Sequence, residues 1–232
     1  MNKLTKFFTW LFILLMSFGF RVFPGKWDVS KSDPTIWIKL CSGSAIVEEN
    51  DITENDPLAG ISGLTFNQVI QSVIDDYNNV PSSYLRLALY PSDPNNPGTP
   101  AAGDSSFTTA LAEKRTIEIC FGETNPTAGI SGGYAQPKYE GGNLIGCNIQ
   151  AKSEYAKKAK FLTHLLTHEL GHCFGLMHPQ EGTKSVMSYF YKDLILRLKN
   201  DDYAGLSYKY PEDDEYSKES YTMGLSGCSP KN

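Results

Sequence analysis

Apolar residues recur at two different spacings along the first half of the chain, and these spacings predict strands and a helix. Residues 35–40, 84–90 and 116–121 are rich in β-branched and aromatic side chains, which favour strands. In residues 65–78, apolar side chains recur every three or four positions, which is typical of an amphipathic helix. Thr65 is placed to cap the first turn of that helix.

The second half of the chain predicts two more strands and two helices. Residues 129–137 and 143–149 are glycine-rich but patterned as strands. Residues 153–176 predict one long helix with Ser153 as its cap, and residues 193–210 predict a second amphipathic helix. Strands and helices together indicate an α+β fold.

The residues that can carry chemistry lie at the end of the predicted long helix. The chain reads H-E-x-x-H-x-x-G-x-x-H from residue 168 to residue 178. Because an α-helix turns about every 3.6 residues, His168 and His172 project from one face and can bind one metal ion. Gly175 allows a turn with positive φ, so His178 can return as a third ligand. Three imidazoles and one open position are typical of a catalytic zinc ion, and Glu169 is placed to activate a water molecule.

The remaining histidine and the cysteines are not expected to bind this metal. His164 lies one turn before His168, but the position that corresponds to Glu169 is Leu165, so we interpret His164 as a supporting or surface residue. The five cysteines contain no C-x-x-C pair, which disfavours a second zinc site; they are Cys41, Cys120, Cys147, Cys173 and Cys228. In an oxidising compartment they would form two disulfides and leave one thiol, with the pairing open.

This motif, followed by Ser185-Val186-Met187-Ser188-Tyr189, resembles the signature of the metzincin clan of zinc endopeptidases. The resemblance implies one catalytic Zn²⁺ with three histidine ligands, His168, His172 and His178. It also implies that Glu169 acts as general base and acid, and that Met187 lies beneath the metal as the Met-turn residue. Tyr189 stands where astacins and serralysins carry a tyrosine that stabilises the oxyanion.

Residues 129–137 also resemble the edge strand of the matrixins, in which a glycine is followed eight residues later by a proline. In that family the strand pairs antiparallel with the bound peptide, which implies a polypeptide substrate bound as an extended strand at Ser131 and Gly132. Gly133 replaces a histidine of the family, so the matrixin structural zinc is not expected, and a calcium requirement stays open.

The resemblance implies a metzincin catalytic domain over most of the chain. Such a domain has a mixed, mostly parallel five-stranded sheet with an antiparallel edge strand, an active-site helix, a Met-turn and a C-terminal helix. The expected division is a signal peptide at 1–20, an N-terminal segment at 21–34, the catalytic domain at 35–211 and a polar tail at 212–232.

The first twenty residues favour secretion. Two lysines precede a short apolar run over residues 7–20, whereas a membrane span takes about 20 apolar residues. We therefore expect a secreted or extracytoplasmic protein, periplasmic in a Gram-negative bacterium, without stable membrane association after cleavage. A retained membrane anchor is the alternative.

Charge and motif together indicate the function. With 26 acidic and 21 basic residues and no basic cluster, the chain is not expected to bind nucleic acid, and we expect a monomer. The predicted activity is zinc-dependent hydrolysis of peptide bonds through a water molecule activated by Glu169. A zinc hydrolase of non-peptide amides and a binding protein with a vestigial site are the alternatives. No P-R-C-G latency motif occurs, and Asp28, after the run Phe23 to Gly25, is the one carboxylate near enough to suggest such a role.

Overall fold

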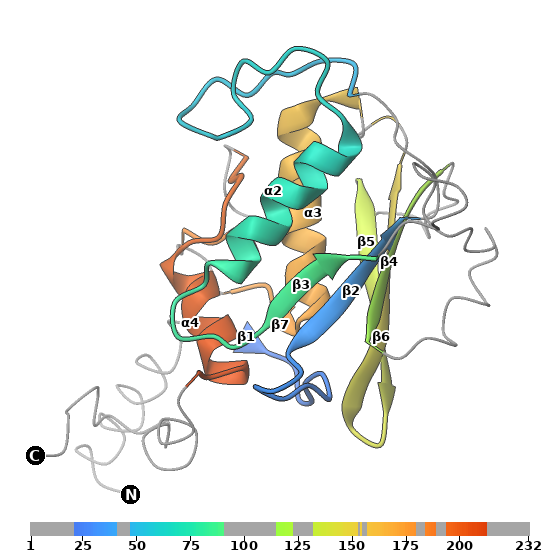
Figure 1. The fold of residues 1–232 in the computed structure, drawn as a ribbon, viewed down its shortest axis with the longest axis vertical. Coiled ribbons are helices and arrows are strands. Elements are labelled where there is room, and N and C mark those ends of the chain that lie inside the picture. Colours follow the sequence, from blue (N-terminus) through green and yellow to red (C-terminus); the bar gives the residue numbers. More distant parts are fainter. Residues whose placement is uncertain are drawn as a thin grey trace, which may run out of the picture.

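The computed structural model describes residues 21–40, 47–90, 115–122, 132–152, 154, 157–179, 184–188 and 194–212. The elements in chain order are β1 (Arg21–Val22), β2 (Thr35–Leu40), α2 (Phe66–Asn78), β3 (Arg86–Leu89), β4 (Thr116–Gly122), β5 (Gly133–Glu140), β6 (Asn143–Lys152), α3 (Ala159–Cys173), β7 (Leu176–Met177) and α4 (Asn200–Lys209) (Figure 1). The predicted signal peptide and all of the polar tail except its first residue lie outside the described residues.

The larger sheet has five strands in the order β3-β2-β4-β6-β5. Strands β3, β2, β4 and β6 pair in parallel, and β5 pairs antiparallel with β6 at the edge. Helices α2 and α3 lie on the same face of this sheet (Figure 1). The predicted fold class, with a mostly parallel sheet and an antiparallel edge strand, is therefore confirmed. A second, two-stranded sheet of β1 and β7 was not predicted.

The early elements form where the local pattern predicts them. Along β2, every second side chain is buried, which places Ile36 and Ile38 on the helix-covered face. Thr65 caps α2: its backbone N–H donates to the Gln68 side chain at 2.9 Å, and its hydroxyl accepts from the Gln68 backbone N–H. The predicted cap and the buried stripe of α2 are both confirmed.

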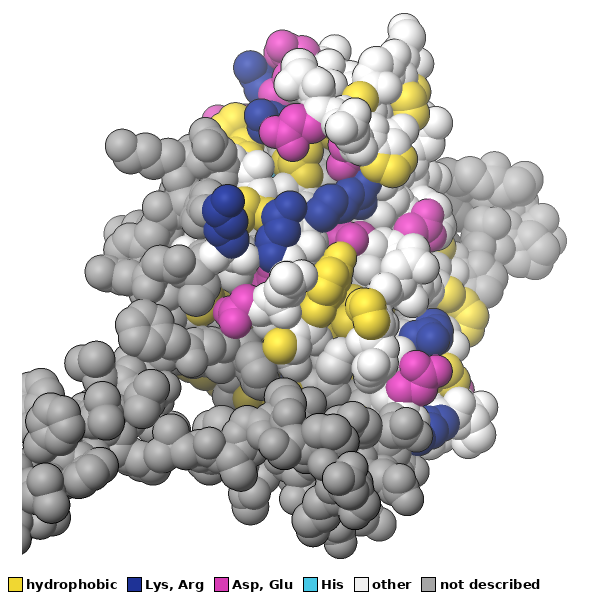
Figure 2. All heavy atoms as spheres, turned by 90° about the vertical axis from the view of Figure 1, so that its left-hand side faces the viewer, with side chains coloured by type: hydrophobic (Ala, Val, Ile, Leu, Met, Phe, Trp, Pro, Cys, Tyr) yellow, Lys and Arg dark blue, Asp and Glu magenta, His cyan; other side chains and the backbone are white. Residues whose placement is uncertain are grey.

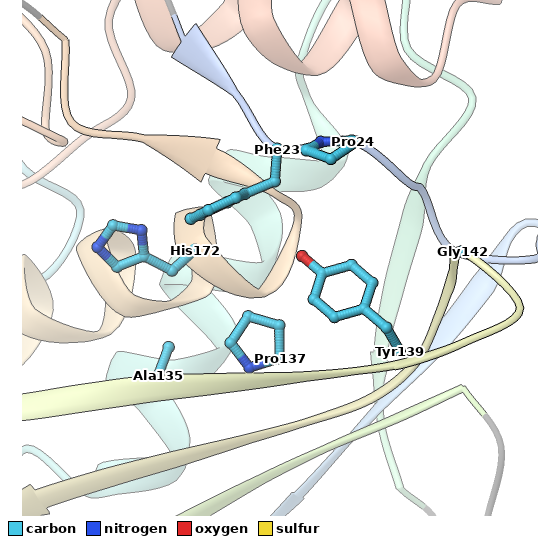
Figure 3. Close-up of a pocket in the computed structure, with 7 residues that line it drawn as sticks. All are labelled: Phe23, Pro24, Ala135, Pro137, Tyr139, Gly142 and His172. Carbon is cyan, nitrogen blue, oxygen red and sulfur yellow. The ribbon is translucent and has the colours of Figure 1, made fainter.

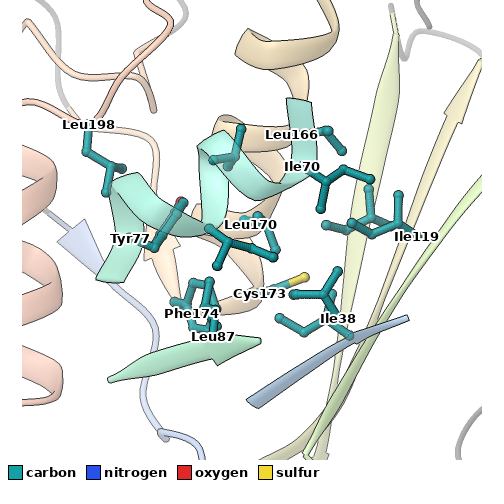
Figure 4. Close-up of a cluster of buried hydrophobic side chains, with 14 of the residues drawn as sticks. Ile38, Ile70, Tyr77, Leu87, Ile119, Leu166, Leu170, Cys173, Phe174 and Leu198 are labelled. Carbon is teal, nitrogen blue, oxygen red and sulfur yellow. The ribbon is translucent and has the colours of Figure 1, made fainter. Parts of the chain in front are cut away.

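The core lies between the two helices and the sheet (Figure 4). Ile70 from α2 and Leu170 from α3 pack with Ile38 and Ile119 from the sheet, and all four are buried. Each such side chain stabilises the fold by about 1.5–3 kcal/mol relative to leaving it in water. The core therefore holds α3 rigidly against the sheet, which matters because α3 carries the histidine motif.

Helix α3 is shorter than the sequence predicts. It begins at Ala159 rather than at residue 153. Strand β6 runs to Lys152, and the backbone of Glu49 then bonds to the Lys157 carbonyl and the Ala159 N–H, both at 2.9 Å, so Lys158 forms a β-bridge instead of a helical turn. The residue before the helix is Lys158, which makes no capping hydrogen bond, so the predicted cap is wrong; the Asp51 carboxylate instead accepts the Lys160 N–H in the first turn at 2.8 Å. At its other end, Gly175 has φ +82°, which confirms the predicted glycine exit from the helix.

The helix predicted over residues 193–210 is also too long. Helix α4 covers only Asn200–Lys209, because the Asp202 carboxylate accepts the backbone N–H of Lys199 at 2.8 Å and caps the helix start there. Residues 194–199 are not helical, and groups on α2, α3 and the preceding loop hold them instead. The contacts are His164 Nδ1 with the Ile195 carbonyl, Thr167 Oγ1 with the Leu196 carbonyl, the Leu198 N–H with Asp76, and Arg197 with Asp56.

A disulfide joins the sheet to the end of α3. It links Cys147 on β6 to Cys173, and both residues are buried. Cys120 is also disulfide-bonded. Cys173, which directly follows a histidine of the motif, is thus a disulfide partner and not a metal ligand. Among the described residues, no helix has the length and apolar character that crossing a membrane requires.

We expect the double variant Cys147→Ala/Cys173→Ala to unfold more easily than the wild type. The crosslink closes a loop with a sequence separation of 26, and such a crosslink typically contributes about 2–4 kcal/mol to the free energy of unfolding. Urea unfolding of both proteins, followed by circular dichroism, measures this difference. An unchanged unfolding midpoint would show that burial of the two side chains, and not the crosslink, holds β6 to α3.

Candidate metal centre

Three histidines from α3 and the segment after it converge on one point. The Nε2 atom of His178 lies 3.2 Å from Nε2 of His168 and 3.1 Å from Nε2 of His172. The ligand atoms of all three residues lie within 4.8 Å of one another. Among the described residues, this is the group of histidine, cysteine and acidic side chains that could hold a metal ion, and neither His164 nor Asp28 belongs to it.

Backbone carbonyls orient two of the rings. Nδ1–H of His168 donates to the carbonyl of Val186 at 2.8 Å, and Nδ1–H of His172 donates to the carbonyl of Leu176 at 2.9 Å. These bonds place the proton on Nδ1 and leave the Nε2 lone pair facing the centre of the cluster. The rings of His168 and His172 stand almost perpendicular, at 86°.

This arrangement fits a tetrahedral metal ion. A zinc ion with Zn–N bonds of about 2.0–2.1 Å holds its nitrogens about 3.3–3.4 Å apart, close to the separations from His178. Burial, together with the neighbouring His172, lowers the pKa of His168 to about 3 and that of His178 to about 4. Burial also lowers the pKa of His172, so all three rings are neutral near pH 7, as metal ligands must be.

Glu169 lies next to the first histidine of the cluster but is not part of it. Its side chain is buried, and burial raises its pKa to about 7. The backbone N–H of Ala135 on β5 donates to its carboxylate, which opposes the shift only in part. The carboxylate is therefore positioned between the histidine cluster and the edge strand. Such a group can exchange a proton near neutral pH.

A buried carboxylate on α4 holds the turn below the cluster. Asp202 is 2% exposed and accepts hydrogen bonds from the Ser185 hydroxyl and, at 3.0 Å, from the Val186 backbone N–H. Burial raises the pKa of Asp202, while these hydrogen bonds act in the opposite direction. Because the Val186 carbonyl orients His168, Asp202 fixes that ring through the turn.

Met187 packs directly beneath the helix that carries the histidines. Its side chain is buried, and a Cβ atom added at Gly171 would lie 2.3 Å from its sulfur. Gly171 sits between His168 and His172 on α3, so the glycine leaves the space that the methionine fills. The contact joins the turn to the helix at the level of the cluster.

The other residues expected at the site lie partly outside the described residues. This applies to Tyr189 and Ser131. Gly132 lies just before β5, where its carbonyl accepts the N–H of Lys152 on β6 at 2.9 Å. Because neighbouring residues of a strand alternate between its two edges, the backbone groups of Gly133 and Ala135 face the free edge.

Two groups at the site were not predicted. Ala135, which contacts Glu169, has no distinctive side chain and gives no sequence signal. Asp202 belongs to the segment from Asp201 to Tyr210. This segment contains the pattern D-D-x-x-G, which resembles the end of a matrixin catalytic domain and could have marked Asp202.

Figure 2 shows one face of the molecule, where basic and acidic side chains are interspersed over the described part.

Comparison with known proteins gives one family match and several weak structural similarities. Residues 104–211 match the family model described as Matrixin. The comparison with curated proteins gives no match. Similar solved structures include high choriolytic enzyme 1, a hatching enzyme zinc-protease from the medaka fish Oryzias latipes, with TM-score 0.37, 9% identity and coverage of 78% of this chain and 92% of that one. Another is metalloproteinase-II from Bacteroides fragilis, with TM-score 0.35, 16% identity and coverage of 79% and 55%. These structural similarities are weak, and the family match covers slightly less than half of the chain.

We expect Gly171→Ala to weaken metal binding by about 10- to 100-fold, because the new methyl group displaces Met187 from beneath the ligands. In an isolated helix the same change would stabilise the helix by about 1 kcal/mol, so a loss of metal affinity cannot come from helix propensity. Competition titration with a chelating dye measures the affinity.

The double variant Gly171→Ala/Met187→Ala relieves the clash and should recover part of the lost affinity, so the two changes should not be additive. Equal metal affinity in the wild type and Gly171→Ala would contradict a role for this contact.

Proposed function

We propose that the chain carries a metzincin-type metalloendopeptidase domain like that of the matrixins, whose family model matches residues 104–211, and that Glu169 activates the attacking water at a zinc ion held by His168, His172 and His178. The observation that carries the proposal is the convergence of three neutral Nε2 atoms beside a buried carboxylate. The protein is further proposed to act as a secreted monomer on polypeptide substrates, with residues 35–211 as the catalytic domain.

The bound metal ion and Glu169 would have separate roles in the reaction. Zn²⁺ bound here would polarise the substrate carbonyl and make a nearby water molecule more acidic. Glu169 would accept a proton from this water as its oxygen bonds to the carbonyl carbon. It would then deliver the proton to the amine nitrogen as the C–N bond breaks. Burial alone raises the pKa of Glu169, which favours its carrying the proton between the two transfers.

Strand β5 would bind the substrate. It is the edge strand of the sheet, and the Ala135 N–H that it donates to Glu169 lies on the free edge. A polypeptide added antiparallel to β5 would therefore pass the catalytic carboxylate. Ser131 and Gly132, at the start of this strand region, stay proposed binding positions.

Secretion is supported by the oxidised cysteines. Cys147, Cys173 and Cys120 are disulfide-bonded, which is typical of extracytoplasmic proteins. The basic start and apolar run in residues 1–20 would direct export.

The purified protein should cleave denatured casein, and a chelator should stop cleavage until zinc is restored. Glu169→Gln should keep the metal but lower kcat by about 10²- to 10⁴-fold, because the amide cannot accept the proton. Metal analysis and casein hydrolysis measure the two effects separately. The contrasting variant His178→Ala should lose metal as well as activity. Full activity in Glu169→Gln would remove Glu169 as the base.

Tyr189→Phe tests the proposed donor to the oxyanion, which rests on the position of Tyr189 two residues after Met187. Loss of one such donor typically lowers kcat by about 10²- to 10³-fold. The expected result is a lower kcat with unchanged zinc content and little change in KM. A variant with wild-type kcat would show that another group stabilises the charge.

A further inference from the structure

Residues 21–27, the first part of the N-terminal segment, are built into the domain beside the proposed active site. Its first two residues form β1, which pairs with β7 directly after the helix exit. The backbone N–H of Phe23 donates to the Gly175 carbonyl at 2.7 Å. Trp27 is completely buried, and its ring N–H donates to the Cys173 carbonyl at 2.8 Å. The segment is thus fixed to the end of α3.

A lysine from α4 holds the same segment from the other side. The ammonium group of Lys209 donates to the carbonyls of Phe23, at 2.8 Å, and Gly25. Gly25 has φ +83°, and a Cβ atom there would lie 2.3 Å from the Gly142 carbonyl oxygen, so only glycine fits between the segment and the β5–β6 turn. These contacts fix the backbone on both sides of Pro24.

Phe23 and Pro24 form one wall of a cavity of about 510 Å³ (Figure 3). The facing wall consists of Ala135, Pro137 and Tyr139 from β5, and His172 lies at the end nearest the histidine cluster. In Figure 3 the rings of Phe23 and Tyr139 both point into the space between the segment and β5. The cavity is therefore continuous with the proposed active site.

The lining is apolar and partly open to solvent. Phe23 is 37% exposed and Tyr139 is 44% exposed, and they are two of the four large hydrophobic side chains exposed among the described residues. The other two, Phe161 and Tyr208, do not line the cavity. Exposed apolar rings that face one another across a cleft are costly to leave in water, and they favour an apolar occupant.

The direction of β5 indicates which part of a substrate would reach the cavity. Ala135 contacts Glu169, so it marks the level of the cleaved bond. Pro137 follows two residues later, about 7 Å along the strand, and Tyr139 follows after a β-bulge between Lys138 and Tyr139. A substrate strand antiparallel to β5 runs the opposite way, so its residues about two to four positions before the cleaved bond would lie over this cavity.

We propose that Phe23 and Pro24 determine specificity by forming the outer wall of a subsite for a large apolar side chain, aromatic or branched aliphatic, on the N-terminal side of the cleaved bond. This inference rests on the proposed function. The small side chain of Ala135 leaves the depth that such an occupant needs. The rings that line the cavity supply contact area; they belong to Phe23, Pro24, Pro137, Tyr139 and His172. Lys209 acts as a positioning residue for this wall.

Cleavage of a peptide library by the zinc-loaded protein, with products identified by mass spectrometry, tests the subsite. The wild type should prefer Phe, Tyr, Leu or Ile two to four residues before the cleaved bond. For peptides with these residues, Phe23→Ala should lower kcat/KM by about 10-fold, mainly through KM. For matched peptides with Ala at that position, it should change kcat/KM less than twofold. Phe161→Ala, an exposed aromatic residue elsewhere on α3, should leave the profile unchanged.

The possible outcomes distinguish a failure of the proposed subsite from a failure of the proposed function. Cleavage without an apolar preference in that region overturns the subsite but leaves the proposed function intact. A uniform loss for all peptides in Phe23→Ala also overturns it, because that result indicates a general structural defect. If Phe23→Ala does not fold, Tyr139→Ala on the opposite wall must show the same selective loss. If the zinc-loaded wild type cleaves no peptide at all, the proposed function itself fails.

Discussion

The hydrogen bonds of the buried Asp202 carboxylate connect the elements that build the proposed active site. This one side chain caps α4 at Lys199 and holds both the hydroxyl of Ser185 and the backbone N–H of Val186. The Val186 carbonyl then orients His168. A buried carboxylate is costly unless its hydrogen bonds are satisfied, so these donors and Asp202 depend on one another. The position of the turn, and of Met187 within it, follows from this anchor.

Backbone carbonyls outside α3 determine the geometry of the histidines as much as the helix does. The spacing on α3 brings His168 and His172 onto one face, but the carbonyls of Val186 and Leu176 select which nitrogen of each ring faces the cluster. Burial keeps the rings neutral. Together these effects direct the lone pairs of His168 and His172 at the metal position before a metal binds, and they support the proposed role of Glu169 beside it.

The N-terminal segment supplies one wall of the proposed substrate cleft. The proposed cleft has β5 on one side and, beyond His172, a wall that comes from residues far away in the chain. Lys209 and the β1–β7 pairing hold that wall in place. A short segment that would otherwise read as a connection from a signal peptide thereby becomes part of substrate selection in the proposal.

Much of this protein could be predicted from sequence, because the features concerned are local. Strand alternation, the Thr65 cap, the glycine exit at Gly175 and the spacing of the histidines each depend on residues a few positions apart. The predicted start of α3 was wrong because backbone pairing with Glu49, more than 100 residues earlier in the chain, overrides helix propensity at Lys157 and Lys158. The partner of Cys173, the bonds of Asp202 to Ser185 and Val186, and the contact between Lys209 and Gly25, 184 residues apart, were decided by the tertiary structure alone. Such contacts form only when the core brings distant segments together, and a local pattern of residues does not specify which distant residues will meet.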